Sequence, residues 1–141
     1  MRSLFLANNN ISFYTDNSVP ALKDLDLSNN NVIDFMNNYF PTATNFTIFK
    51  NRKMARFDNN NLDSIATLYI GTNELSSFSN NFLRSLTTLS IEESPAESMK
   101  FVGNRVQALK VLNLTGNNIS DFKGNTLSAL EELYLGHGSI Q

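Results

Sequence analysis

The 141-residue sequence contains no cysteine and only one histidine, His137. Without cysteine the chain can form neither disulfide bonds nor thiolate metal sites. His137 also lacks a second histidine at the H-x-x-x-H spacing of a helical metal site. We therefore predict no metal site and no cofactor.

Long apolar runs are also absent. No stretch approaches the roughly 18 apolar residues that a membrane helix needs. The first ten residues contain an apolar patch of only four residues, which is too short for the core of a signal peptide. The 11 basic and 13 acidic residues give a net charge of −2, so neither sign dominates. We expect no membrane segment in this chain and no nucleic-acid partner.

The short motifs of common enzymes are missing as well. The sequence has no G-x-S-x-G, no phosphate-binding loop with a lysine and no H-E-x-x-H. The adjacent carboxylates Glu92 and Glu93, like Glu131 and Glu132, fall near expected strands. Neighbours in a strand point to opposite sides, so these residues should not form an acid–base pair. We predict that the protein is not an enzyme.

A repeat of 21 to 23 residues runs through the whole chain. Its clearest copy, residues 109–122, has the pattern L-x-x-L-x-L-x-x-N-x-I-x-x-F. With Leu114 as the reference, the equivalent residues of the other copies are Leu6, Leu27, Ile48, Ile70, Ile91 and Leu135. The residues two and five positions before each reference are apolar in every copy. This pattern predicts short strands with one buried face, which one copy can bury only if others stack on it.

Asparagine recurs three residues after the reference in five of the seven copies. These residues are Asn9, Asn30, Asn51, Asn73 and Asn117. An amide side chain both donates and accepts hydrogen bonds, so we predict a ladder that bridges successive coils. Two residues later the position is apolar except at Lys53, where we expect Met54 to fill the slot. A far wall of the core should come from Tyr14, Phe35, Phe78, Met99 and Phe122, with Phe57 one place late.

This pattern resembles the leucine-rich repeat family over the whole chain, and its short period looks like the extracellular, protist-type members. The resemblance implies an α/β fold: a right-handed solenoid with a parallel β-sheet on its concave face and a mostly irregular or 3₁₀ convex side. It also implies recognition of a protein or glycan on the concave face, without catalysis.

We predict one solenoid over residues 1–141, without capping domains. The predicted coils are residues 1–21, 22–42, 43–64, 65–85, 86–108, 109–129 and a partial coil over 130–141. Secreted members of the family usually close their ends with disulfide-bonded caps, which this chain cannot form. Three explanations stay open: the chain is cytoplasmic, it is part of a longer protein, or something else covers its ends.

The residues that flank each reference position should face outward from the strands. From them we select the candidate ligand-binding residues Asp26, Phe49, Tyr69, Glu92 and Tyr134. Exposed aromatic side chains are typical of binding surfaces. The alternative is that Phe49 and Tyr69 stack across strands and only stabilise the sheet. Asp26 and Glu92 should lie on the order of 14 Å apart, which is too far to share a calcium ion.

Four asparagines begin N-x-S/T sequons: Asn10, Asn45, Asn113 and Asn118. With 22 asparagines and 25 serines and threonines in 141 residues, about four sequons are expected by chance, so their number carries no weight. All four fall at positions expected to be exposed. In an extracellular protein they would be available for N-glycosylation.

The two ends of the predicted stack should carry bare apolar residues: Leu4 and Leu6 at one end, Leu133 and Leu135 at the other. Each large apolar side chain left in water forfeits roughly 1.5–3 kcal/mol, so we expect these ends to be covered. We predict a recognition segment of a larger extracellular or cell-surface protein, with a cytoplasmic location as the alternative. The alternative function is a filament subunit whose uncapped ends dock on other copies.

Overall fold

The computed structural model describes residues 1–135. They form a parallel β-solenoid of about six turns, in which each turn of the chain contributes two short strands. No helix occurs in these residues, and therefore none that could span a membrane.

The strands alternate between two sides of the solenoid, and their numbering reflects this. The odd-numbered strands are β1 (Ser3–Phe5), β3 (Asp24–Asp26), β5 (Asn45–Thr47), β7 (Thr67–Ile70), β9 (Thr88–Ile91), β11 (Val111–Asn113) and β13 (Glu132–Tyr134). The even-numbered strands are β2 (Phe13–Thr15), β4 (Asp34–Met36), β6 (Arg56–Asp58), β8 (Ser77–Ser79), β10 (Met99–Val102) and β12 (Ile119–Lys123). Each predicted full coil contains one strand of each kind.

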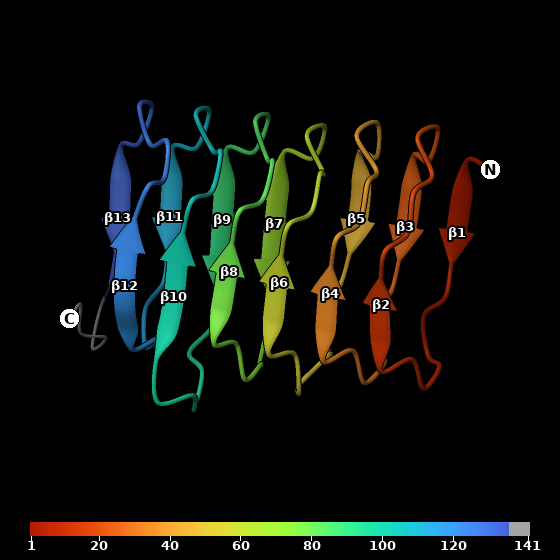
Figure 1. Ribbon diagram of the computed structural model, residues 1–141, viewed down its shortest axis with the longest axis horizontal. Helices are drawn as coiled ribbons and strands as arrows, with labels where there is room; N and C mark the ends of the chain where they lie inside the picture. Colours follow the sequence, from red (N-terminus) through yellow and green to blue (C-terminus); the bar gives the residue numbers. More distant parts are fainter. Residues whose placement is uncertain (136–141) are drawn as a thin grey trace.

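Every pairing between coils is parallel (Figure 1). The even strands form one six-stranded sheet, whereas the odd strands form a three-stranded sheet, β1-β3-β5, and a four-stranded sheet, β7-β9-β11-β13. The row of odd strands is thus interrupted between β5 and β7. We call the outer surface of this row the odd-strand face; it is the face that the sequence predicts to be concave.

The core lies between the two rows of strands. Leu25, Leu68, Leu89 and Leu112 of the odd strands are buried, whereas β5 contributes Phe46, which is partly buried. From the even strands, one aromatic ring per coil points inward and stacks on the next. The row comprises Tyr14, Phe35, Phe57, Phe78, Phe101 and Phe122, with centroids 4.9 to 5.7 Å apart.

A row of asparagines, which we call the inner asparagine ladder, follows the aromatic row. It comprises Asn17, Asn38, Asn60, Asn81, Asn104 and Asn125. From Asn17 to Asn104, each Nδ2 donates to the Oδ1 of the next ladder asparagine at 3.0 to 3.1 Å. From Asn38 onward, Nδ2 also donates to the carbonyl of the core aromatic residue in the preceding coil, at 2.9 Å each time. The ladder therefore locks three consecutive coils together at each step.

A left-handed turn residue ends each even strand just before the ladder asparagine. The residue that precedes the ladder asparagine has a positive φ in every coil: Asp16, Asn37, Asn59, Asn80, Gly103 and Gly124. Asparagine, aspartate and glycine tolerate this left-handed conformation better than other residues do. The repeated signal is thus an aromatic residue, any residue, then Asp, Asn or Gly, then Asn.

Three sequence-based expectations require correction. The solenoid is confirmed, but the α/β class is wrong because residues 1–135 contain no helix. The side expected to be irregular carries the six-stranded sheet of even strands instead. The far wall of the fifth coil is Phe101 rather than Met99. Phe57, which comes one place late in the sequence, joins the far wall as expected and pairs in register with Phe35 and Phe78.

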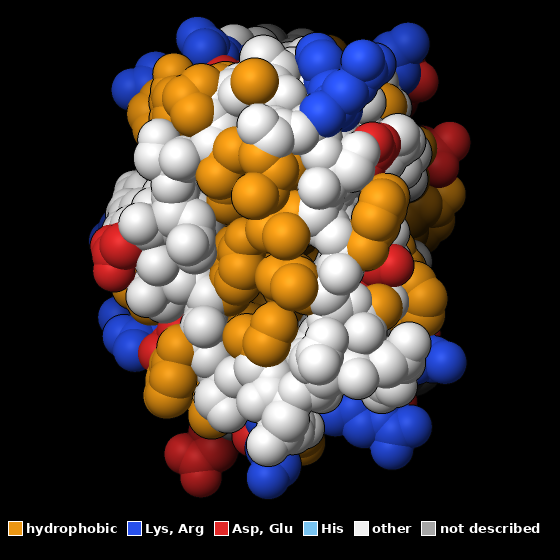
Figure 2. All heavy atoms as spheres, turned by 90° about the vertical axis from the view of Figure 1, so that its right-hand side faces the viewer, with side chains coloured by type: hydrophobic (Ala, Val, Ile, Leu, Met, Phe, Trp, Pro, Cys, Tyr) orange, Lys and Arg blue, Asp and Glu red, His pale blue; other side chains and the backbone are white. Residues whose placement is uncertain are grey.

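The N-terminal end of the stack exposes the edge of the core. Figure 2 shows a central apolar band at this end, with the charged side chains at the rim. Leu4, Leu6, Ile11, Tyr14 and Val19 pack against the core there and are only partly buried. Toward the other end, Leu135 is also partly buried, and 43% of the Leu133 surface is exposed.

Candidate functional site

The predicted ligand-binding residues all lie on the odd-strand face, but the structure brings only three of them together. Phe49, Tyr69 and Glu92 line one depression, which lies at the interruption between β5 and β7. Asp26 lines a separate depression beside Phe5 and is half-buried. Tyr134 lies on the terminal strand β13, where its hydroxyl donates to Glu132 at 2.7 Å. The candidate site is therefore centred on Phe49, Tyr69 and Glu92.

Glu92 holds the Tyr69 side chain in place. The Tyr69 hydroxyl donates a hydrogen bond to Glu92 Oε1, and Thr72 Oγ1 donates to Glu92 Oε2 at 3.3 Å. The Tyr69 ring edge passes Gly71, where an added Cβ would lie 3.6 Å from Tyr69 Cε1. The hydrogen bond to Glu92 raises the pKa of Tyr69, and partial burial of the hydroxyl adds to this. The phenol is thus a neutral, oriented ring at neutral pH.

The two aromatic rings remain accessible. Phe49 is 38% exposed and Tyr69 49% exposed. Within residues 1–135, ring-to-ring contacts occur among the buried and partly buried aromatic residues of the core, and neither Phe49 nor Tyr69 takes part in one. The Lys50 Nζ lies 5.7 Å from the Phe49 ring centroid. This geometry does not support the alternative that the two rings stack across strands.

The sequence analysis did not predict the basic residues of the site, because the Lys- and Arg-rich stretch of coil three departs from the repeat pattern. Residues 50–53, which we call the basic turn, contain Lys50, Arg52 and Lys53, all exposed. Lys50 and Arg52 line the depression of Phe49 and Tyr69 and also a second depression with Lys53. As expected, Met54 is buried beside the exposed Lys53.

The backbone of the basic turn is unusual at Lys50. Its φ is +61°, and all six other non-glycine residues with positive φ in residues 1–135 are asparagine or aspartate. Equivalent positions in the first two coils carry Asn8 and Asn29, and Asn29 Nδ2 donates to Asn8 Oδ1 at 2.6 Å. A left-handed lysine costs roughly 1–2 kcal/mol relative to its ordinary conformation, so local stability does not account for its presence.

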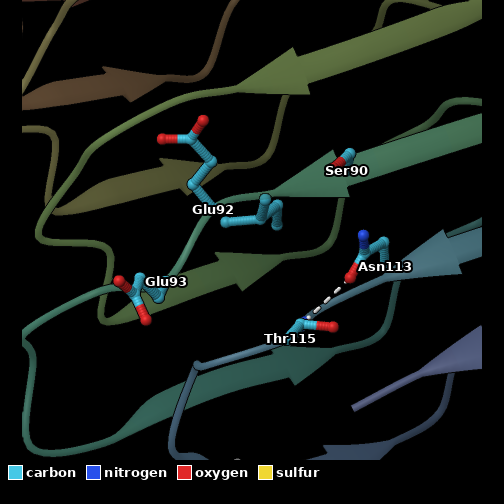
Figure 3. Close-up of a pocket in the computed structure, with 6 residues that line it drawn as sticks. Ser90, Glu92, Glu93, Asn113 and Thr115 are labelled. Atoms are coloured by element: carbon cyan, nitrogen blue, oxygen red, sulfur yellow. Dashed lines mark hydrogen bonds between the residues drawn. The ribbon is translucent and has the colours of Figure 1, made fainter. Parts of the chain in front are cut away.

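A neighbouring depression is lined by Ser90, Glu92, Glu93, Asn113 and Thr115 (Figure 3). The Glu92 and Glu93 carboxylates extend in different directions from the chain. The Thr115 amide donates to Asn113 Oδ1 at 3.0 Å. Across the described part of the chain, no three His, Asp or Glu side chains converge as a metal site would require. His137 lies outside the described residues.

The predicted asparagine ladder lies beside the odd strands, and its members make different contacts. Asn30 and Asn51 donate to carbonyls of their own and the preceding coil at 2.8 to 3.0 Å. Asn9 donates only within its own coil, whereas Asn73 donates to the Glu92 carbonyl of the following coil at 3.2 Å. Asn117 donates to Ile91 and Leu114, both at 3.1 Å.

The sequon asparagines Asn10, Asn45 and Asn118 are exposed, and Asn113 is half-buried. The Ser3 hydroxyl and Asn45 Nδ2 each donate to the Asp24 carboxylate at 2.7 Å, and these two hydrogen bonds, that of Ser3 first, lower the pKa of Asp24.

No protein-family model matches the chain, and neither a curated protein nor a solved structure does.

Proposed function

We propose that the chain is a non-catalytic recognition segment of a larger extracellular protein, and that it binds a protein or a glycan on the odd-strand face. The observation that carries this proposal is the depression in which Phe49 and Tyr69 present accessible rings beside Lys50 and Arg52. Tyr and Arg are enriched in binding hot spots. An extracellular location would leave the exposed sequons Asn10, Asn45 and Asn118 open to glycosylation.

The chain is best interpreted as a variant of the leucine-rich repeat architecture. The support is the L-x-x-L-x-L pattern, whose leucines are buried in and beside the odd strands, for example Leu112 in β11 and Leu109 and Leu114 on either side of it. In this variant a second sheet, with its aromatic row and inner asparagine ladder, replaces the irregular convex side. Binding on the strand face is what the resemblance implies.

The combined substitution of Phe49→Ala and Tyr69→Ala should weaken binding at least tenfold to any glycan or protein that an array selects with the parent chain. The free energy of unfolding should change by less than about 1 kcal/mol, because both rings lie on the surface. The matched control replaces Phe13 and Tyr39, which are 63% and 46% exposed and lie away from the site. An unfolded Phe49/Tyr69 variant would instead favour a purely stabilising role for the two rings, and an equal loss in the control would show non-specific adhesion.

A second candidate function is a filament subunit, and the apolar band at the N-terminal end of the stack favours it (Figure 2). Strands β1 and β13 each have a free edge in the described chain. A second copy that docked there would continue the parallel pairing and cover Leu4 and Leu6, and such a heterologous contact does not close on itself.

If the ends dock, Leu135→Asp should abolish fibres seen by electron microscopy and reduce the sedimenting species to monomer. A buried interface does not tolerate an unpaired carboxylate. Thr115→Asp, at an exposed position of the odd-strand face, is the control and should leave assembly unchanged. Fibres that persist in Leu135→Asp would exclude end docking, and a parent chain that is monomeric would exclude the filament function.

A further inference from the structure

We propose that the basic turn and the aromatic residues beside it form a binding site for a carboxylated sugar of an anionic polysaccharide. This inference rests on the proposed recognition function and specifies its ligand. The residues are Phe49, Lys50, Arg52, Tyr69 and Glu92, which line one depression.

Within residues 1–135, no carboxylate forms an ion pair with the cations of the basic turn. The ion pairs of residues 1–135 are Arg56 with Asp34, Arg84 with Asp63, and Lys123 with Asp121. Lys50, Arg52 and Lys53 belong to none of them. Three cations within four residues, on a chain of net charge −2, attract an anionic group, and the guanidinium fork of Arg52 matches a carboxylate.

Lys50 supplies the second argument. Its left-handed backbone suits the asparagine found at Asn8 and Asn29, whose side chains also bond to each other. Lys50 cannot continue this side-chain hydrogen bonding between asparagines, and its ammonium group instead lies near the Phe49 ring. An unfavourable backbone conformation in a binding depression indicates a functional requirement for the side chain.

The remaining groups match a sugar ring. The exposed faces of Phe49 and Tyr69 offer apolar platforms, while Thr72 and Glu92 offer hydrogen-bonding groups for hydroxyls. A peptide that bound by strand addition would need a free sheet edge together with these side chains. The odd-strand row has outer edges at β1 and β13 and two more edges, β5 and β7, at the interruption beside the depression. Because β5 and β7 contact each other across the interruption, an extended peptide could add there only by parting two stacked coils. This placement favours a glycan over an extended acidic peptide.

The test measures binding of the full chain to galacturonate, glucuronate and mannuronate oligomers, to their neutral methyl esters and to polyglutamate, by calorimetry at low ionic strength. The charge variant combines Lys50→Asn with Arg52→Gln. Its control combines Lys100→Gln with Lys110→Gln, which removes the same charge at exposed positions elsewhere. We expect the parent to bind at least one uronate oligomer, with at least tenfold weaker binding to its ester and to polyglutamate. The charge variant should lose at least tenfold, and the control less than twofold.

The midpoint of thermal unfolding should stay unchanged or rise in the charge variant, because Lys50→Asn restores the asparagine of the first two coils. A parent that binds none of the uronates, a charge variant that binds as the parent does, or equal binding of the methyl ester would overturn the site. Tighter binding of polyglutamate would identify an acidic protein as the partner instead. If Phe49→Ala with Tyr69→Ala abolishes binding of another array ligand that the charge variant retains, the recognition function stands and only the anionic sugar is wrong.

Discussion

Replacing Asn81 with alanine should lower the free energy of unfolding by about 4 kcal/mol. Asn81 is fully buried, and its Nδ2 donates to the carbonyl of Phe57 and to Asn104 Oδ1. Its Oδ1 accepts from the backbone and the side chain of Asn60. Alanine would leave several of these groups buried without partners, and each unsatisfied group costs about 1–3 kcal/mol. Chemical denaturation measures the loss directly.

Two further variants separate the hydrogen bonds of Asn81 from the loss of side-chain volume. Asn81→Asp keeps the shape but replaces the donor with an acceptor that faces two oxygens, so it should destabilise the chain at least as much. Asn118→Ala makes the same substitution at an exposed side chain and should change the free energy by less than about 0.5 kcal/mol. A stable Asn81→Ala variant would show that the inner asparagine ladder does not hold the coils together.

Replacing Phe57 with alanine should cost about 4 kcal/mol, the middle of the range for a buried phenylalanine. The Phe57 ring is fully buried between Phe35 at 5.0 Å and Phe78 at 4.9 Å. In a solenoid each coil contacts only its neighbours, so a cavity at this central coil weakens the coupling between the two halves of the stack. Calorimetry should therefore show a lower and broader unfolding transition.

Phe122→Ala is the matched control within the same aromatic row. Phe122 is only partly buried and stacks on Phe101 at 5.4 Å. Phe122 buries less apolar surface than Phe57 does, so its replacement should lower the free energy of unfolding by no more than about 2 kcal/mol. If Phe57→Ala and Phe122→Ala lowered the free energy of unfolding equally, the stabilising effect of a ring in the row would not depend on its position in the solenoid, contrary to this account.

The buried positions in and beside the odd strands could be predicted from the sequence, because three apolar residues recur at the same repeat positions in every coil. Leu22, Leu25 and Leu27 of the second coil are all buried. The outward direction of Phe49 and Tyr69 follows from the same alternation, and both rings are exposed.

The even sheet could not be predicted in the same way. Its shortest strands have three residues, and each of these contributes one aromatic residue to the row in the core. In β4, for example, this residue is Phe35, between Asp34 and Met36. Three residues are too few to establish a period of two. The asparagine clusters hid the inner ladder, because Asn59 is the left-handed turn residue, Asn60 the buried ladder residue and Asn61 a bridge residue. Each inner-ladder asparagine comes three residues after a core aromatic residue, and this spacing would have distinguished it from its neighbours in the cluster.

The basic turn could be seen in the sequence but not placed. Arg52 and Tyr69 are 17 positions apart, and they share a depression only because coil four stacks on coil three. That proximity depends on the register between coils, which is set by the core and the ladders rather than by the residues of the turn itself.

The central claim is that the odd-strand face is the recognition surface, and amide chemical-shift mapping by NMR tests it most directly. The labelled chain would be titrated with the array-selected ligand. We predict that the shifts concentrate at Phe49, Tyr69 and Thr72 and on the adjoining strands β7 and β9. Shifts confined to β6, β8 and β10, or to the ends of the stack around Leu4 and Leu133, would contradict the claim.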